Sequence, residues 1–391
     1  MNNPQKTYPA VIVGGGPVGL FLGICLEQAG ISCRILEKRP APTGDSRSLG
    51  IHPPSLELLD AAGITGQLVR EGVRISRGHA FAQTQKIGSL SFEECPPPFN
   101  FVLSLPQSRT EQLLEAHLHQ LNSRVLIRGA EVVDFIETQD HQTVTYRIEG
   151  ATRSIRAKYV IGCDGKESFI RHYAGISFEG KTYPDTYVMG DFADNTDFGS
   201  DAAIFLCEEG LIESFPLPGN RRRWVVKTDN YHSTDQRRII EKAVHQRIQH
   251  PLFGIDHFML SSFGVEKRVA GQMVKKRSIL AGDAAHVVSP IGGQGMNLGW
   301  LGAWDLSQCL RQMFDHSSPR NRDSELLKGF EQRRKKAARN AAGRGEFNMR
   351  MGRKVPLPAV RNGIVSLMLN TPLSRLMARL FTMRGLDRWI I

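Results

Sequence analysis

Short apolar runs that end in glycine turns alternate with longer helical segments over much of the chain. Residues 11–13 (VIV) have the apolar character of a buried parallel strand and lead through a glycine turn into LFLGICLEQAG, which is typical of a helix. A second short run, CRILE, ends at Glu37, and two further runs end at Asp164-Gly165 and Gly282-Asp283. This alternation predicts an α/β fold with a mostly parallel, Rossmann-like sheet.

The middle of the chain has a different pattern. Residues 74–100 and 173–269 alternate apolar and polar positions, as in TYVMGDFAD and RRRWVVKTD, and this period of two predicts antiparallel strands. We expect Arg221, Arg222 and Arg223 to form a solvated hairpin corner rather than a site for a substrate carboxylate. Three aromatic residues suit core packing and the lining of an apolar pocket equally well, namely Phe205, Phe215 and Trp224.

Length and composition limit the class of protein. A chain of 391 residues with 41% hydrophobic and 23% charged residues is typical of a globular protein with one large composite domain or two to three interleaved parts. The six cysteines are scattered without a C-x-x-C pair, so we predict neither a disulfide framework nor a metal site. The N-terminal residues lack the pattern of an export signal, and no apolar run approaches the roughly 20 residues that span a bilayer. A cytoplasmic location is therefore expected.

The glycine turn after the first strand has the spacing Gly14-x-Gly16-x-x-Gly19. Gly14 permits a tight turn, Gly16 lets the backbone approach a pyrophosphate, and Gly19 allows close packing of helix on strand. The helix N-terminus favours phosphate, and Glu37 can accept a hydrogen bond from a ribose hydroxyl. A simple strand-to-helix turn is disfavoured, because three glycines before a helix cost stability without such a reason. The motif predicts dinucleotide binding but does not distinguish NAD from FAD.

Two later strand ends carry similar signals. Asp164-Gly165 alone fits a capping aspartate in a turn as well as a nucleotide contact. Asp283 also follows a strand, where it can hold a sugar hydroxyl. The run PIGGQG (290–295) then precedes the apolar helix MNLGWLGAWDLSQCL, so its backbone N–H groups can face an anionic or electron-rich ring.

These three signatures, in this order, resemble those of the single-component, group A FAD-dependent aromatic monooxygenases, the para-hydroxybenzoate hydroxylase-like family. Two further stretches agree, SRSLGIHPPSLELLDAAGI and LPQSRTEQLLEAHL, and the resemblance covers roughly residues 8–345. It implies an FAD-binding domain (1–73, 101–172 and 270–345) interleaved with a β-sheet substrate domain (74–100 and 173–269). A basic, amphipathic helical tail follows at 346–391.

The resemblance also implies which residues contact FAD. Gly292 lies in the implied flavin loop with Pro290 and Gly293. Arg109 stands beside Gln107, and Arg171 stands seven residues beyond Asp164. The implied contacts are Gly14, Gly16, Pro17, Val18, Gly19, Glu37, Lys38, Arg47, Gln107, Asp164, Asp283, Pro290, Gly293, Gly295, Met296 and Asn297.

The implied reaction uses NADPH or NADH and O2 to hydroxylate an apolar aromatic, phenolic or quinone-like substrate through a flavin C4a-hydroperoxide. Because the flavin carries this chemistry, no catalytic side chain is assigned, although His52 and Pro290 are weak candidates. We interpret His286 as structural, since a general base must first meet a geometric test. Two alternatives remain: an FAD-dependent reductase of an isoprenoid-like substrate, and a flavin-binding accessory protein without turnover.

The tail holds most of the positive charge. Residues 319–391 contain 17 Lys/Arg and 5 Asp/Glu, whereas the rest of the chain, with 33 basic and 34 acidic residues, is nearly neutral. An apolar stripe recurs there at helical spacing, formed by Leu373, Leu376, Met377, Leu380 and Phe381. Such a helix can pack on its own FAD-binding domain, form a homodimer contact in a protein otherwise monomeric, or lie on the inner face of an anionic membrane. Nucleic-acid binding has only net charge in its favour.

Overall fold

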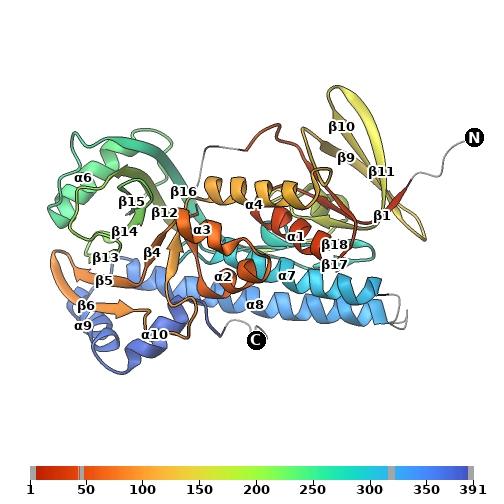
Figure 1. The fold of residues 1–391 in the computed structure, drawn as a ribbon. Helices are drawn as coiled ribbons and strands as arrows, with labels where there is room; N and C mark the ends of the chain where they lie inside the picture. The colour runs from red at the N-terminus through yellow and green to blue at the C-terminus, as the bar shows by residue number, and fades with distance from the viewer. Residues whose placement is uncertain (1–5, 43, 45–47, 316–321, 386–391) are drawn as a thin grey trace, which may run out of the picture.

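The computed structural model describes residues 6–385 apart from 43, 45–47 and 316–321, and it places two large β-sheets side by side (Figure 1). The first sheet has the order β17-β18-β11-β1-β2-β8, and its central neighbours are parallel. Its strands are β1 (Thr7–Val13), β2 (Cys33–Glu37), β8 (Leu126–Arg128), β11 (Ala151–Gly162), β17 (Val274–Lys275) and β18 (Ser278–Leu280). The predicted α/β fold with a mostly parallel sheet is confirmed.

Helices cover one face of this sheet, and a β-hairpin extends it beyond β11. One face is covered by α1 (Pro17–Gln28), which packs between the sheet, α4 (Gln107–Asn122) and α7 (Gln294–Phe314). This position explains why α1 is apolar on nearly all sides, from Gly19 to Leu26. The strands β9 (Glu131–Glu137) and β10 (Gln142–Ile148) extend the sheet as an antiparallel ribbon beside β11.

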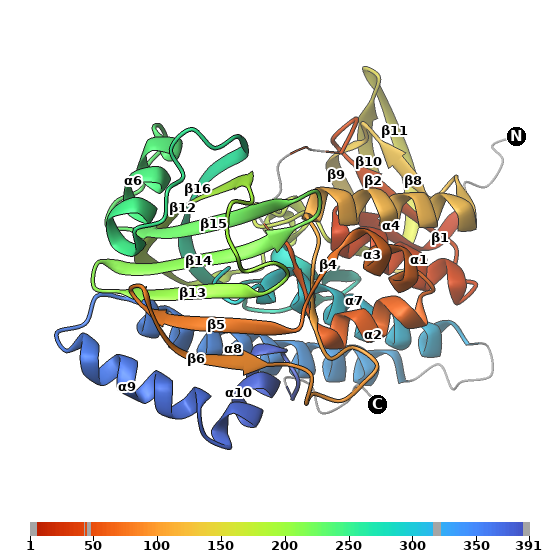
Figure 2. The ribbon, with the colours of Figure 1, turned by 60° about the vertical axis from the view of Figure 1, so that its left-hand side comes forward.

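The second sheet has the order β19-β16-β12-β15-β14-β13-β5-β6, and every pairing except β13 with β5 is antiparallel. Helix α6 (Gln236–Ile248) packs on one face over Phe205 and Trp224, and the opposite face looks toward the first sheet (Figure 2). The strands are β5 (Arg77–Ala82), β6 (Gln85–Ser91), β12 (Phe178–Ala193), β13 (Ala202–Cys207), β14 (Gly210–Leu217), β15 (Arg221–Thr228), β16 (His257–Ala270) and β19 (His286–Val287).

Smaller elements join the two sheets. A short sheet with the order β3-β7-β4 lies beside α2 and α3. The chain that follows β11 passes Asp164 and enters α5, and the chain that follows β18 enters a 3₁₀ turn, η1, which contains Asp283. Their bounds are β3 (Gly50–Ile51), β4 (Val73–Ile75), β7 (Val102–Ser104), α2 (Pro53–Ala61), α3 (Thr65–Glu71), α5 (Phe169–Tyr173) and η1 (Gly282–Ala284).

The tail is helical, as predicted, and its last two helices pack on the antiparallel sheet rather than on the FAD-binding domain. Helix α8 (Asp323–Gly352) runs beneath both sheets, whereas α9 (Pro358–Leu369) and α10 (Leu373–Phe381) lie against β6 (Figure 2). The carbonyl oxygen of Ile87 in β6 accepts hydrogen bonds from Ser366 and Asn370 of this tail. The two helices therefore cover the edge strand of the antiparallel sheet, and they pair one of its backbone groups, the carbonyl oxygen of Ile87.

Candidate active site

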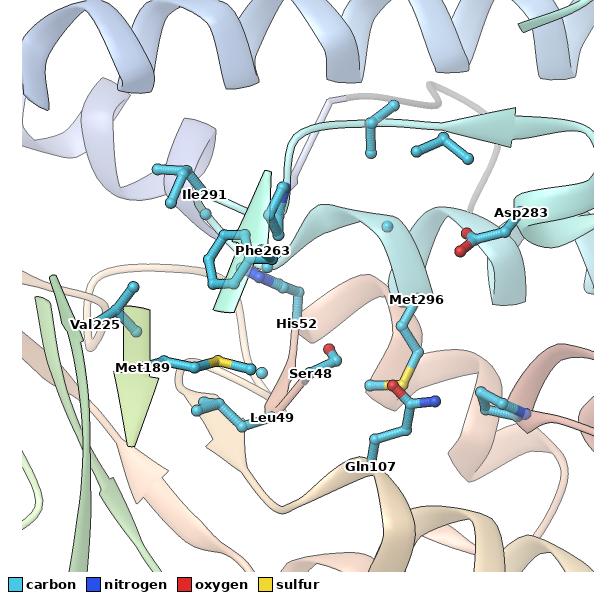
Figure 3. Close-up of a pocket in the computed structure, with 18 of the residues that line it drawn as sticks. Ser48, Leu49, His52, Gln107, Met189, Val225, Phe263, Asp283, Ile291 and Met296 are labelled. Atoms are coloured by element: carbon cyan, nitrogen blue, oxygen red, sulfur yellow. The ribbon is translucent and has the colours of Figure 1, made fainter. Parts of the chain in front are cut away.

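A large cavity of about 1060 Å³ lies between the two sheets. One part, which we call the nucleotide end, is lined by the glycine turn before α1, the ends of β2 and β11, and the segment around Asp283. The other part, which we call the chamber, is lined by the antiparallel sheet and the helices of the tail (Figure 3). This volume is at the upper end of the roughly 300–1,000 Å³ of small-molecule sites.

The glycine turn before α1 shows why each glycine is needed. Gly14 has φ +107°, and a Cβ there would lie 2.3 Å from the carbonyl oxygen of Cys163; a Cβ on Gly19 would lie 2.0 Å from that of Gly14. These two glycines permit close backbone packing. At Gly16 a Cβ would meet no atom within 4 Å, because this position faces the cavity. Gly16 also caps α1 without a side-chain hydrogen bond, so the N-terminal N–H groups of the helix are available to a ligand.

Glu37, at the end of β2, lies beside this turn. Its carboxylate accepts hydrogen bonds from the backbone N–H of Gly15 at 2.6 Å and from the backbone and Nε of Arg39 at 2.9 Å each. Burial alone would raise the pKa of Glu37, but the hydrogen bonds from Arg39 and Gly15 outweigh it and lower the pKa. Glu37 is therefore ionised, and its contacts fix the shape of the turn.

Asp164 caps its own turn and also lines the cavity. Its carboxylate accepts hydrogen bonds from the hydroxyl of Ser168 at 2.5 Å and from the backbone N–H of Ile170 at 3.1 Å. Arg171 donates to the carbonyl oxygens of Lys166 and Ala284, which joins this segment to the one around Asp283. The two later signatures are thus held together as one unit.

Asp283 and the glycine loop before α7 form the middle of the cavity. The carboxylate of Asp283 lies deep between the sheets but is open to the cavity, and its removal from bulk water raises its pKa to about 6. Gly292 and Gly293 adopt φ +93° and +65°, a left-handed conformation that favours glycine. Gly293 begins α7 without a side-chain cap, so a second helix N-terminus faces the same cavity.

Both weak catalytic candidates line the cavity. His52 is buried where α2 begins, against Gly293, and burial lowers its pKa to about 4, so its ring is neutral near pH 7. Its Nδ1 is buried and has no hydrogen-bond partner in the described part of the chain. Pro290 is exposed to the cavity on the same loop. His286 is buried in β19 and does not line the cavity.

Most of the other predicted contacts line the cavity as well. The lining residues among them are Gly14, Gly16, Pro17, Val18, Glu37, Lys38, Gln107, Asp164, Asp283, Gly292, Gly293, Gly295 and Met296. Arg47 lies outside the described residues. Arg109 pairs on the surface with Glu71. Asn297 is fully buried, and its amide bonds to the backbone of Gly50, His52 and Gly293, so its side chain ties α7 to α2 rather than facing the cavity.

The expectation for the three arginines was wrong at two positions. Arg222 and Arg223 are 0% and 1% exposed. Consecutive residues of β15 point to opposite faces of the sheet, and both faces are covered here, one by α6 and the other by the chamber. Arg222 pairs with Asp194 behind the sheet, whereas Arg223 lines the chamber and forms a two-point ion pair with Asp191 at 2.6 and 2.9 Å. For the three aromatic residues, the structure distinguishes pocket lining from core packing. Phe215 lines the chamber, and Phe205 and Trp224 belong to the core under α6.

Several chamber residues could not be found from motifs. The antiparallel sheet contributes Met189, Val225 and Phe263, which approach His52 and Ile291 in Figure 3, together with the acid Glu213. The period of two predicted these strands, but it gives no indication of which face meets the cofactor. The tail contributes Met351, Val365, Met368, Leu369, Met377 and Phe381, of which only Met377 and Phe381 belong to the predicted stripe.

Comparisons with known proteins agree with this geometry. The family model described as "FAD binding domain" matches residues 7–344. A Bacillus subtilis protein named uncharacterized aromatic compound monooxygenase YhjG is 34% identical over 338 residues, which are 85% of this chain and 66% of that protein. This chain belongs to the para-hydroxybenzoate hydroxylase-like FAD-dependent monooxygenase family.

A second relative and a solved structure extend the comparison. The rifampicin monooxygenase of Streptomyces venezuelae is 30% identical over 80% of this chain and 66% of its own length. The crystal structure of p-nitrophenol 4-monooxygenase from Pseudomonas putida superimposes with a TM-score of 0.89, at 21% identity, over 96% of this chain and 98% of that one, which shows the shared fold. The chain spans about two thirds of the length of these first two curated relatives.

The residues present fit the FAD that gives this monooxygenase family its name. The open position beside Gly16, the uncapped N-termini of α1 and α7, and the carboxylate of Asp283 all face one cavity. The position beside Gly16 and the N-terminus of α1 suit the pyrophosphate, the N-terminus of α7 suits the flavin ring, and Asp283 suits the sugar-alcohol chain between them. Among the residues that the structure describes, no group of three or more His, Cys, Asp or Glu side chains is placed to hold a metal ion.

Proposed function

We propose that this chain hydroxylates an apolar aromatic, phenolic or quinone-like compound, using NADH or NADPH, O2 and bound FAD. The observation that carries the proposal is the continuity of the cavity, which joins three nucleotide-binding turns to an apolar chamber. The relatives named above support it, since their names describe oxygenation of aromatic compounds, rifampicin and p-nitrophenol. FAD, when bound, supplies the redox chemistry of oxygen transfer.

The protein's own part is to hold the cofactor, position the substrate and exclude water. Gly16 and the N-terminus of α1 are assigned to the pyrophosphate, Glu37 to the adenosine side, and Asp283 to the sugar-alcohol chain. The loop at 290–296 is assigned to the flavin ring. Met189, Val225 and Phe263 provide an apolar surface opposite this loop, which favours an aromatic ring over a hydrated substrate.

A test of this activity follows oxygen into the product. The purified holoenzyme is supplied with NADH or NADPH, a panel of phenols and 18O2, and product mass and O2 uptake are measured. A product that gains one 18O atom for each substrate consumed supports hydroxylation. Reduction of an isoprenoid-like substrate without 18O would instead favour the reductase, and no substrate-dependent turnover across the panel would favour an accessory protein.

We also propose a peripheral membrane contact through α9 and α10. Arg361, the charged residue of α9, is buried and donates to the carbonyl oxygens of Leu206 and Cys207, so the outward face of the helix is apolar. The apolar side chains exposed on the two helices and at their start are Leu357, Val360, Ile364, Leu367, Leu373 and Leu376. Arg350 at the end of α8 and Arg379 of α10 are exposed, and the tail is strongly basic, which suits an anionic lipid surface. None of the described helices is long and apolar enough to cross a membrane.

Vesicle sedimentation tests this contact on the full-length holoenzyme. Ile364 and Leu367 are 45% and 60% exposed, and we expect the variant Ile364→Glu/Leu367→Glu to lose pelleting with phosphatidylglycerol-containing vesicles. The control Ile136→Glu, at a 59% exposed position on β9, should pellet like the unchanged protein. Equal pelleting of all three rejects the membrane contact. A loss of dimer in sedimentation velocity, without any vesicle binding, would assign the same face to a second copy of the chain.

A further inference from the structure

Glu213 is a buried acid in the middle of an apolar wall. It lies on β14, where Val225 of β15 and Ile204 of β13 are its partners in the neighbouring strands. Met189 of β12 continues this row, and all four residues line the chamber. Figure 3 shows Met189 and Val225 of this row facing the cavity. Along β14 itself, the next residues on the same face are Leu211 and Phe215, which also line the chamber.

The carboxyl of Glu213 has no hydrogen-bond or ion-pair partner among the residues described. Glu213 is only 6% exposed, and burial raises its pKa to about 7. The nearby basic side chains of this face are engaged elsewhere, since Arg223 binds Asp191 and Lys227 lies 3.8 Å from Asp185. A buried carboxyl without a partner costs stability, so its presence in a substrate chamber calls for a ligand that satisfies it.

A second polar group lies close to this acid without a partner. The hydroxyl of Tyr187 is buried, and its ring stacks on Phe263 with the ring centres 5.2 Å apart. Burial, and then the charge of Glu213, raises the pKa of Tyr187. Tyr187 does not line the cavity, so in this row of the wall Glu213 is the polar group that a ligand can reach. A polar group set in an apolar surface is the usual design of a site that fixes the orientation of an aromatic ligand.

We propose that Glu213 is a specificity-determining residue that accepts a hydrogen bond from a phenolic hydroxyl or an aromatic amino group of the substrate. This assignment rests on the proposed function and narrows its substrate class to ring compounds that carry a hydrogen-bond donor. Above its pKa the ionised carboxylate only accepts hydrogen bonds, so in that form it selects donors. A methyl ether of the same ring would leave the acid unsatisfied and bind more weakly.

The test uses three probes of one ring system: 2-naphthol, 2-naphthylamine and 2-methoxynaphthalene. Dissociation constants are measured at about pH 8, where Glu213 is mostly ionised, on the oxidised holoenzyme from the change in flavin absorbance, without any turnover. We expect the unchanged protein to bind the two donors about 10-fold or more tightly than the ether, as expected for a hydrogen bond to a charged group. Glu213→Gln, whose amide oxygen still accepts, should keep part of this preference, and Glu213→Leu should bind all three probes within about 2-fold.

The matched control is Glu241, another buried glutamate, which lies on α6 behind the sheet and pairs with Arg237. Glu241→Gln and Glu241→Leu should keep the full preference for donors. Equal binding of naphthol and ether by the unchanged protein, or a preference that survives in Glu213→Leu, overturns the proposal. The 18O2 measurement is independent of this binding test. A donor preference that depends on Glu213, without oxygen insertion, supports the role of Glu213 and rejects hydroxylation. Oxygen insertion with a binding preference that does not depend on Glu213 supports hydroxylation and rejects the role of Glu213.

Discussion

The two parts of the cavity are built by opposite means. At the nucleotide end, the decisive positions are glycines, where a missing side chain lets the backbone of β1 and α1 pack closely or leaves room for a ligand. In the chamber, the decisive positions are side chains such as Met189, Val225 and Glu213, which project from alternate residues of ordinary strands. A side chain added at Gly14 or Gly19 must therefore displace backbone, whereas a side chain of the chamber can change without altering the backbone. Removing single contacts at either end tests this difference.

The largest effect is expected at the ion pair between Arg223 and Asp191. Arg223→Met leaves the carboxylate of Asp191, which is 8% exposed, without its cation, and we expect a loss of about 3–5 kcal/mol in the free energy of unfolding. Urea unfolding measures this loss. The double variant Arg223→Met/Asp191→Leu removes both charges and should recover most of it. A single variant as stable as the unchanged protein would show that the pair is not a structural part of the chamber.

The next effect is the pH dependence that Glu213 imposes on stability. Its pKa is about 7 in the folded protein against an ordinary value of 4.5, so between these values the folded chain holds a proton that the unfolded chain has released. The free energy of unfolding should therefore fall as pH rises from about 4.5 to 7, by up to about 3 kcal/mol. Glu213→Gln lacks this proton, so its stability relative to the unchanged protein should increase between pH 5 and 8. A constant difference over this range would contradict the assignment.

At the nucleotide end, Gly19→Ala should destabilise the protein and release FAD. A Cβ at Gly19 would lie 2.0 Å from the backbone oxygen of Gly14, so α1 must move away from the turn. We expect a loss of about 1–3 kcal/mol, the range for overpacked sites, in thermal or urea unfolding of the apoprotein. Gly343→Ala, in α8 with no atom within 4 Å of the new Cβ, serves as the control and should be as stable as the unchanged protein or slightly more.

The smallest effect on stability, and the sharpest test of the comparison, is expected for Gly16→Ala. The added methyl group meets no protein atom within 4 Å, so the apoprotein should unfold within about 0.5 kcal/mol of the unchanged protein. It occupies the space assigned to the pyrophosphate, so FAD affinity, measured by titration of the apoprotein, should fall clearly. Unchanged FAD affinity would remove Gly16 from the proposed site.

The same contrast explains what could be predicted from the sequence. The turn at Gly14–Gly19 and the acid at Asp283 were located because backbone geometry demands particular residue types at fixed spacing, and the structure places both at the cavity. Arg222 and Arg223 were misjudged because a run of three charges suggests a solvated corner, whereas the strand turns one arginine to each face. The tail helices were predicted from their stripe, but the surface that they cover depends on β6, far away in the sequence.

The hydrogen bond between Ser366 and Ile87 joins two segments that are synthesised at very different times. The first strands, helix α1 and the turn between them come from the first 37 residues, whereas one wall of the chamber comes from residues beyond 350. Contacts between such distant segments form late, because the intervening chain must first be ordered. During synthesis, therefore, the glycine turn emerges from the ribosome long before the chamber can close. The segments assigned to FAD, from Gly14 to the loop at 290–296, are all synthesised before the part of the tail that completes the chamber.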